Sequence, residues 1–188
     1  MKTFQDICTE EFDNVNLLKR GGQKVVYEGN HKVYGESAGI EMTRRELREH
    51  CFKMLFCADF YSAGELKGQL EQYFEAPQED ETTKEGESRI LHCVDMEEKD
   101  RSYLLLKGTA VLERLPELDA RIDEVAQGWK TRRMGKVELT ILRLALYEML
   151  HDDEIPEKVA INEAVELAKK FGGDDAPSFI NGVLAKLV

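Results

Sequence analysis

The chain has 188 residues, of which 42% are hydrophobic and 34% charged, and its net charge is −11. This length and composition suit one globular domain with a sizeable core and exclude an intrinsically disordered chain. No segment approaches the roughly 20 consecutive apolar residues of a membrane-spanning helix, and residues 1–12 lack the basic and apolar regions of a signal peptide. We therefore expect a cytoplasmic protein without membrane contact, which needs a local basic patch or a basic partner to bind nucleic acid.

The first 41 residues differ in character from the rest of the chain. They contain five glycines, and their most regular feature is a short predicted strand at 24–27 followed by a turn. A strong helical pattern begins at Met42. We expect residues 1–41 to be an extension of unknown role, either flexible or derived from an early start codon, and residues 42–188 to form the folded domain.

From Met42 onward, apolar residues recur with the spacing of helices. An acidic stretch at 76–88 interrupts the pattern, and we interpret it as a solvated loop, with a binding tail for a basic partner as the alternative. The pattern predicts an all-α bundle without strands after Met42. The seven predicted helices lie at about 43–61, 63–75, 97–114, 117–127, 136–150, 156–171 and 175–187. The fifth is apolar on most sides and is therefore expected to be central.

The sequence contains no recognisable catalytic or metal-binding motif. It lacks a P-loop, G-x-G-x-x-G, H-E-x-x-H and G-x-S-x-G, and its four cysteines form no C-x-x-C pair. Cys51 and Cys57 fall within an apolar helical pattern, which predicts buried thiols in a reducing compartment. The titratable residues at 151–154 are consecutive, so a solvated loop is favoured over a metal site. We expect no enzyme, no cofactor and no metal.

Three arginines open the first predicted helix. Arg44, Arg45 and Arg48 are spaced three and four residues apart, so we expect all three to project to one region at the outer end of the helix. The planar guanidinium donates two parallel hydrogen bonds to phosphate. The alternative is a solubilising face paired with Glu46 and Glu49, and helix physics alone favours this alternative.

Two further features indicate contact with nucleic acid. Trp129 stands beside Lys130, Arg132 and Arg133, a combination that binds single strands by stacking and charge. The alternative is that Trp129 anchors the core and the basic residues line a helix start. Phe179 borders the apolar stripe of the last helix and is either core edge or an exposed stacking platform.

Four segments carry a resemblance to a known family. Residues 44–49 begin an arginine-rich helix, 138–149 end with a Tyr-Glu pair, 159–169 read VAINEAVELAK, and 179–184 read FINGVL. These segments resemble the NusB transcription antitermination family, and the resemblance extends from Met42 to Val188. It implies a seven-helix fold of two packed halves. It also implies binding to single-stranded boxA RNA of ribosomal RNA leader transcripts, with ribosomal protein NusE as partner, in a complex that lets RNA polymerase read through terminators.

The resemblance assigns roles to individual residues. It places Arg44, Arg45 and Arg48 on RNA. The cluster at Lys130, Arg132 and Arg133 stays a candidate for additional RNA contacts. It places Phe179 against a base, with Asp175 on the same surface, and turns Phe56 and Glu138 toward NusE. Phe56 replaces a tyrosine common in the family, and Glu46 interrupts a longer arginine run. The change at Phe56 removes a hydroxyl contact. The interruption at Glu46 predicts weaker RNA binding by the isolated protein and reliance on basic NusE.

Two other functions remain open at this stage. The same helical fold forms the RNA-binding front module of ribosomal RNA methyltransferases, which requires a catalytic domain after Val188. A helical scaffold that binds only protein is the other alternative, and in it the arginines form a solvated face. Some members of the family form homodimers that cover their RNA surface, so a homodimer is a further expectation to test.

Overall fold

The computed structural model describes residues 42–75, 79–82, 88–92, 94, 96–126 and 128–187. The predicted extension at 1–41, with its short strand, lies outside the described residues and stays a prediction. Within them the chain forms seven α-helices and two 3₁₀ helices, which confirms the predicted all-α fold class. The helices are α2 (Arg44–Leu55), η1 (Phe56–Asp59), α3 (Leu66–Tyr73), α4 (Glu98–Glu113), α5 (Leu115–Val125), η2 (Thr131–Arg133), α6 (Lys136–His151), α7 (Glu157–Phe171) and α8 (Ala176–Leu184). None of these helices is long and apolar enough to cross a membrane.

A small β-hairpin interrupts the helices between α3 and α4. Strands β1 (Glu79–Thr82) and β2 (Ser88–His92) pair antiparallel, with an irregularity between Glu79 and Asp80. The expectation of no strands after Met42 was therefore wrong here. The register sets Glu81 opposite Arg89, an oppositely charged pair. The hairpin was not predicted because the run of acidic residues indicated a solvated loop. The charge pattern of one segment does not reveal which segment pairs with it as a strand.

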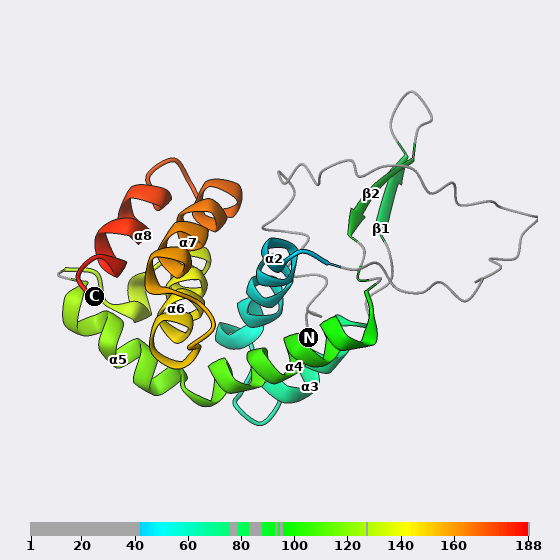
Figure 1. The fold of residues 1–188 in the computed structure, drawn as a ribbon, viewed down its shortest axis with the longest axis horizontal. Coiled ribbons are helices and arrows are strands. Elements are labelled where there is room, and N and C mark those ends of the chain that lie inside the picture. The colour runs from blue at the N-terminus through cyan, green and yellow to red at the C-terminus, as the bar shows by residue number, and fades with distance from the viewer. Residues whose placement is uncertain are drawn as a thin grey trace, which may run out of the picture.

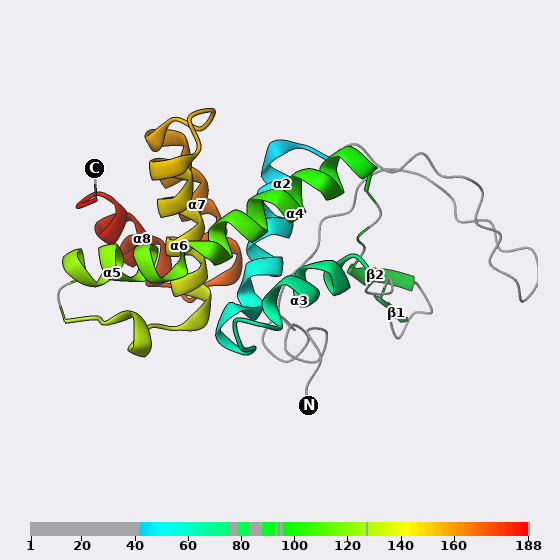
Figure 2. The same ribbon diagram turned by 90° about the horizontal axis from the view of Figure 1, so that it is seen from below.

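The helices form two halves that lie side by side (Figures 1 and 2). In the N-terminal half, α4 packs on α2 and α3, and the hairpin projects from its outer end. In the C-terminal half, α6 packs against α5, α7 and α8. The two halves meet where α2, η1 and α4 contact α6. This arrangement confirms the predicted bundle of two packed halves.

Helix α6 occupies the centre, as its sequence predicted. Six apolar side chains on successive turns are almost fully buried, so this helix has no solvent face along most of its length. They are Leu139, Ile141, Leu142, Leu144, Ala145 and Leu146. Arg143 lies in the same run and is also buried. Its guanidinium donates to Asp119 on α5 at 2.7 Å and to Asp59 in η1 at 2.7 Å, which ties the two halves together.

The beginning of α2 is fixed by a capping box. The Thr43 hydroxyl accepts a hydrogen bond from the Glu46 amide at 3.3 Å, and the Glu46 carboxylate accepts one from the Thr43 amide at 2.9 Å. These bonds satisfy two backbone donors that the first helical turn would otherwise leave unpaired. The cap therefore sets the first helical residue at Arg44, one residue after the predicted start at 43. The α-helix ends earlier than predicted and continues as η1.

A tight turn joins α7 to α8. Gly172 follows α7 directly, and a Cβ atom at this position would lie 2.5 Å from the Ala176 Cβ and 2.9 Å from the Ala168 carbonyl oxygen. Only glycine allows the two helices to approach so closely. The predicted helix stop at Gly172 is thus confirmed, and the turn sets the direction of the helix that carries Phe179.

Candidate nucleic-acid interface

Two of the three α2 arginines point into solvent. Arg44 is exposed and makes no hydrogen bond or ion pair with the residues that the structure describes. Arg45 is 57% exposed and forms a two-pronged contact with Glu163 on α7, with Nε at 3.2 Å and Nη2 at 3.0 Å from its oxygens. Hydrogen bonding and charge from Glu163 raise the pKa of Arg45. Both groups are permanently charged and can meet phosphate.

Arg48 points inward, so the expectation that all three arginines project to one outer region was wrong for this residue. Its side chain is 9% exposed, and Nε lies 3.1 and 3.0 Å from the two oxygens of Glu148. Nη1 lies 3.5 Å from Glu163. Arg48 is three residues from Cys51 and seven from Leu55, and these spacings put it on the buried face of α2. These spacings are visible in the sequence, so the burial of Arg48 could have been predicted from them.

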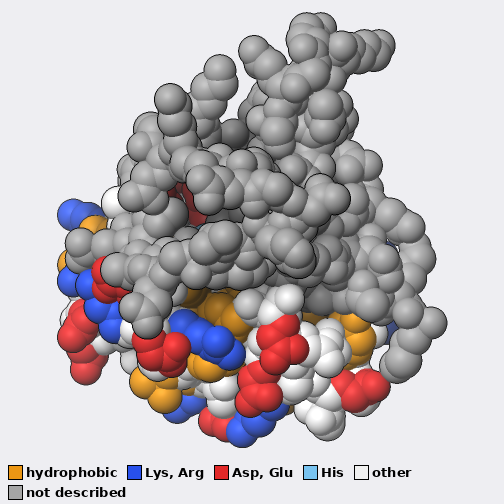
Figure 3. Space-filling model, turned by 90° about the vertical axis from the view of Figure 1, so that its right-hand side faces the viewer, with side chains coloured by type: hydrophobic (Ala, Val, Ile, Leu, Met, Phe, Trp, Pro, Cys, Tyr) orange, Lys and Arg blue, Asp and Glu red, His pale blue; other side chains and the backbone are white. Residues whose placement is uncertain are grey.

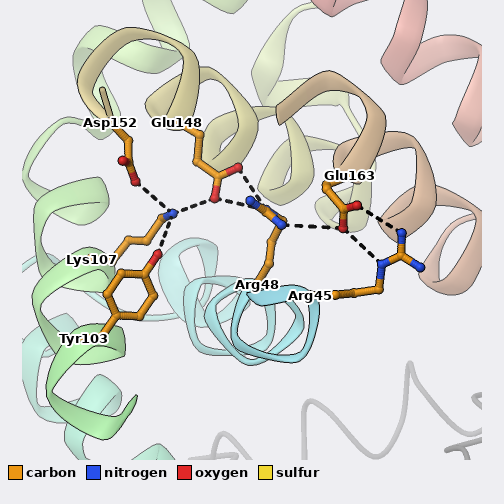
Figure 4. A network of polar contacts seen from close by, with 7 residues as sticks. All are labelled: Arg45, Arg48, Tyr103, Lys107, Glu148, Asp152 and Glu163. Atoms are coloured by element: carbon orange, nitrogen blue, oxygen red, sulfur yellow. Dashed lines mark hydrogen bonds and ion pairs between the residues drawn. The ribbon is translucent and has the colours of Figure 1, made fainter. Parts of the chain in front are cut away.

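Glu148 is the centre of a buried polar network (Figure 4). It is 1% exposed and accepts from Arg48 and from Lys107, whose Nζ lies at 2.6 Å. Lys107 also donates to Asp152 at 3.2 Å and to the Tyr103 hydroxyl at 3.1 Å. Burial lowers the pKa of Lys107, but the charges of Glu148, Cys51 and Tyr103 and the hydrogen bond to Glu148 together outweigh it, and the net shift is upward. The network joins α2, α4 and α6, and sequence reasoning missed both Lys107 and Glu148.

A second candidate contact lies on the other side of α7. The rings of Trp129 and Phe179 meet edge to face, with centroids 5.9 Å apart and an interplanar angle of 64°. Trp129 is 58% exposed, so the alternative of a core anchor is wrong. Phe179 is half-buried, and its inner edge packs on the core. The pair presents aromatic surface to solvent with one ring braced by the protein interior.

Polar groups surround this aromatic pair. Arg132 is exposed and has no partner among the residues described here. Lys130 donates to the Asp123 carbonyl at 3.2 Å, and Arg133 donates to the Gly128 carbonyl at 3.2 Å, so the ends of both side chains are held by the backbone. Asp175 is exposed at the N-cap of α8, without a side-chain capping bond, one turn before Phe179.

The two candidate contacts are separated by α7. In both ribbon views α7 lies between α2 and α8 (Figures 1 and 2). Glu163 and Lys170 of α7 pair with Arg45 and Glu49 of α2, and α8 packs on the other side of α7. The structure thus brings Arg44 and Arg45 together and, separately, Trp129 and Phe179. A ligand that touches both must cross α7.

The residues expected to face NusE have different environments. Phe56 is fully buried, with ring centroids 6.3 Å from Phe52 and 5.3 Å from Phe60, so its expected position on a surface was wrong. Phe60, which sequence reasoning missed, is 41% exposed. Glu138 is half-buried in the first turn of α6. An ion pair of 3.2 Å between Asp59 and Lys136 brings the Phe60 loop to the start of α6.

The described residues contain no group of three or more His, Cys, Asp or Glu side chains that could hold a metal ion. Cys51 and Cys57 are free and buried, as predicted, and burial raises the pKa of each thiol to about 12. Both stay protonated at neutral pH and behave as small apolar side chains. Cys8 and Cys93 lie outside the described residues.

Comparison with known proteins identifies the family. A model described as the NusB family matches residues 45–188. The transcription antitermination protein NusB of Lachnoclostridium phytofermentans is 45% identical over 147 residues, which cover 78% of this chain and 99% of that protein. The protein of the same name from Agathobacter rectalis is 48% identical over 145 residues, covering 77% of this chain and 98% of that protein.

Solved structures agree with this assignment. T. maritima NusB superposes with a TM-score of 0.64 at 27% identity, over 79% of this chain and 92% of that chain. A structure of the antitermination factors NusB and NusE in complex with dsRNA superposes with a TM-score of 0.55 at 22% identity, over 77% of this chain and 94% of that chain, and shares the fold. The chain therefore belongs to the NusB family.

Proposed function

We propose that this chain is a cytoplasmic transcription antitermination factor. It binds boxA RNA of ribosomal RNA leader transcripts together with ribosomal protein NusE, helps RNA polymerase read through terminators, and performs no reaction itself. The observation that carries the proposal is the match over nearly the whole length of relatives named transcription antitermination proteins, at 45–48% identity. Exposed arginines and an exposed aromatic pair supply the chemistry that single-stranded RNA requires.

The RNA path runs from α2 across α7 to α8. Arg44 and Arg45 bind phosphates at one end, and these contacts position the strand. At the other end an unpaired base stacks on the Trp129–Phe179 pair, with Asp175 beside it. The cations of Lys130, Arg132 and Arg133 add phosphate contacts there. Arg48 does not reach the RNA, because it is buried against Glu148 and lies beside Glu163, the carboxylate that pairs with Arg45.

NusE binds the surface formed by the Phe60 loop and the start of α6. Phe60 supplies an exposed ring, Glu138 supplies a carboxylate, and Phe56 supports the ring from beneath. A basic partner also compensates the charge of −11. On the face seen in Figure 3, described basic and acidic side chains are interspersed and do not form one basic patch. We therefore expect NusE to contribute much of the affinity for RNA.

The test is a titration of labelled boxA RNA with this chain, with and without NusE, at several salt concentrations. We expect tight binding with NusE, weaker binding alone, and little binding to an RNA of scrambled sequence. Replacement of Arg44 and Arg45 by Ala should lower the slope of log affinity against log salt by about 1.4, at roughly 0.7 for each lost phosphate contact.

The matched control for this titration is Lys67→Ala. Lys67 is equally exposed, on α3, and pairs with Glu113. Its removal should leave the slope unchanged. Equal binding of boxA and scrambled RNA, or no binding with NusE present, would contradict the proposed function and favour a scaffold that binds only protein. An unchanged slope in the double arginine variant would remove the two arginines from the RNA path.

A further inference from the structure

A pocket of about 340 Å³ lies beside the α2 arginines. It opens between the start of α2, the middle of α4 and the connection from α6 to α7. Its rim and walls are formed by Arg44, Arg45, Tyr103, Ile155, Pro156 and Val159. The volume falls at the lower end of the range of small-ligand sites. Of the residues that line this pocket, the RNA path described above places only Arg44 and Arg45 on RNA.

The walls and the floor of the pocket differ in chemistry. Tyr103 is 40% exposed and Val159 is 45% exposed, so aromatic and apolar surface faces the opening. The floor contains Lys107, Arg48 and Glu148, whose charges are paired with one another and with Asp152 (Figure 4). The pocket thus offers an aromatic and apolar wall over a neutralised floor. Among the described residues, Arg44 on the rim has no counter-ion, and the lining also includes Glu154.

The Tyr103 ring is held in place before any ligand arrives. Lys107 donates to its hydroxyl at 3.1 Å, and the same Nζ lies 5.5 Å from the ring centroid. Lys107 is in turn fixed by Glu148 at 2.6 Å. A ring held by such a chain of contacts loses little conformational freedom on binding, and preorganisation of this kind favours affinity.

We propose that this pocket takes one unstacked nucleotide of the bound RNA, with the base against the Tyr103 ring and the adjoining phosphates on Arg44 and Arg45. The inference rests on the proposed function, since it names a second base position on the same strand. Proteins recognise single-stranded RNA mainly through bases that are splayed out and stacked on aromatic side chains. Tyr103 would hold a base at the α2 end of the path, as the Trp129–Phe179 pair does at the α8 end.

The test compares three substitutions at Tyr103 in the full chain, using the same titration with boxA RNA and NusE. Tyr103→Phe keeps the ring, Tyr103→Leu keeps apolar bulk without a ring, and Tyr103→Ala removes both. Stacking predicts that Phe retains affinity, whereas Leu and Ala each weaken binding by about five-fold or more. The salt slope should stay unchanged in all three, because no charge is removed. Thermal unfolding of each variant checks that the fold is retained.

The matched control is Leu106→Ala. Leu106 is 75% exposed on the same helix, three residues further on, and is not among the pocket residues. Its replacement should leave RNA affinity unchanged. Full affinity in the Leu variant would overturn the stacking proposal, and so would a loss in the Phe variant equal to that in Ala. Both outcomes leave the proposed function intact as long as the unmodified chain binds boxA; if it does not, the proposed function itself fails.

Discussion

The α2 arginine region and the Trp129–Phe179 region reach toward RNA in opposite ways. At α2 most of the positive charge is already satisfied, because Arg45 is held by Glu163 and Arg48 is buried against Glu148. Beside α8, Trp129 is exposed, Phe179 is half-buried, and Arg132 has no counter-ion among the described residues. Under the proposed function, Arg45 in the first region must exchange an internal ion pair for phosphate, whereas the exposed ring and Arg132 in the second region have no ion pair to exchange. The number of arginines in a motif therefore overstates the charge available to a ligand.

The largest effect is expected at Glu148, where Ala should remove the carboxylate nearest to two buried cations and leave Lys107 with Asp152 and Arg48 with Glu163. Breaking a buried pair costs about 3–5 kcal/mol of unfolding free energy, and chemical denaturation measures it. Glu124→Ala is the matched control, since Glu124 pairs with Arg121 on an exposed face of α5. A loss below about 1 kcal/mol, the range of exposed pairs, would show that water reaches this network and that Arg48 is not committed to it.

The substitution Phe179→Ala tests the role of the aromatic region. Loss of base stacking should weaken boxA affinity by roughly 1–3 kcal/mol. The salt slope should not change, in contrast to the α2 arginine variants. Phe60→Ala is the control for loss of a partly exposed ring, and it should weaken binding of NusE without affecting RNA contacts made by this chain. A lower melting temperature with unchanged RNA affinity would assign Phe179 to the core alone.

The smallest expected effect is a gain in RNA affinity. Glu163→Gln should free Arg45 for phosphate and strengthen RNA binding by about 1 kcal/mol or less, because Arg45 is more than half exposed and solvent screens its ion pair. Glu166→Gln, which frees Lys169 on the same helix, is the control for a simple loss of negative charge. Weaker binding in the Glu163 variant would mean that this carboxylate positions Arg45 and does not compete for it.

The sequence predicted the helical framework well, because the signals for a helix lie close together in the chain. The helical spacing of apolar residues, the largely apolar α6 and the helix stop at Gly172 each depend on neighbours within a few residues. These signals yielded seven helices and most of their boundaries. They failed for the hairpin at 79–92, because strand pairing joins segments that look unrelated when examined one at a time.

The site was harder to predict because it depends on distant partners. Arg48 was expected to be exposed with its neighbours, yet Glu148 lies 100 residues further along the chain and draws it inward. Phe56 was placed on a surface, although Phe60 covers it and takes the exposed position. The roles of Lys107 and Tyr103 could not be recognised from the sequence, because an isolated Lys in a helix is ordinarily exposed to solvent.

The capped start of α2 also has a consequence for whatever precedes it. The Met42 amide donates to Asp100 at 3.1 Å, and Arg44 follows two residues later at the rim of the pocket. Any upstream peptide, whether native or a fused tag, is therefore tethered within two residues of the proposed nucleotide site.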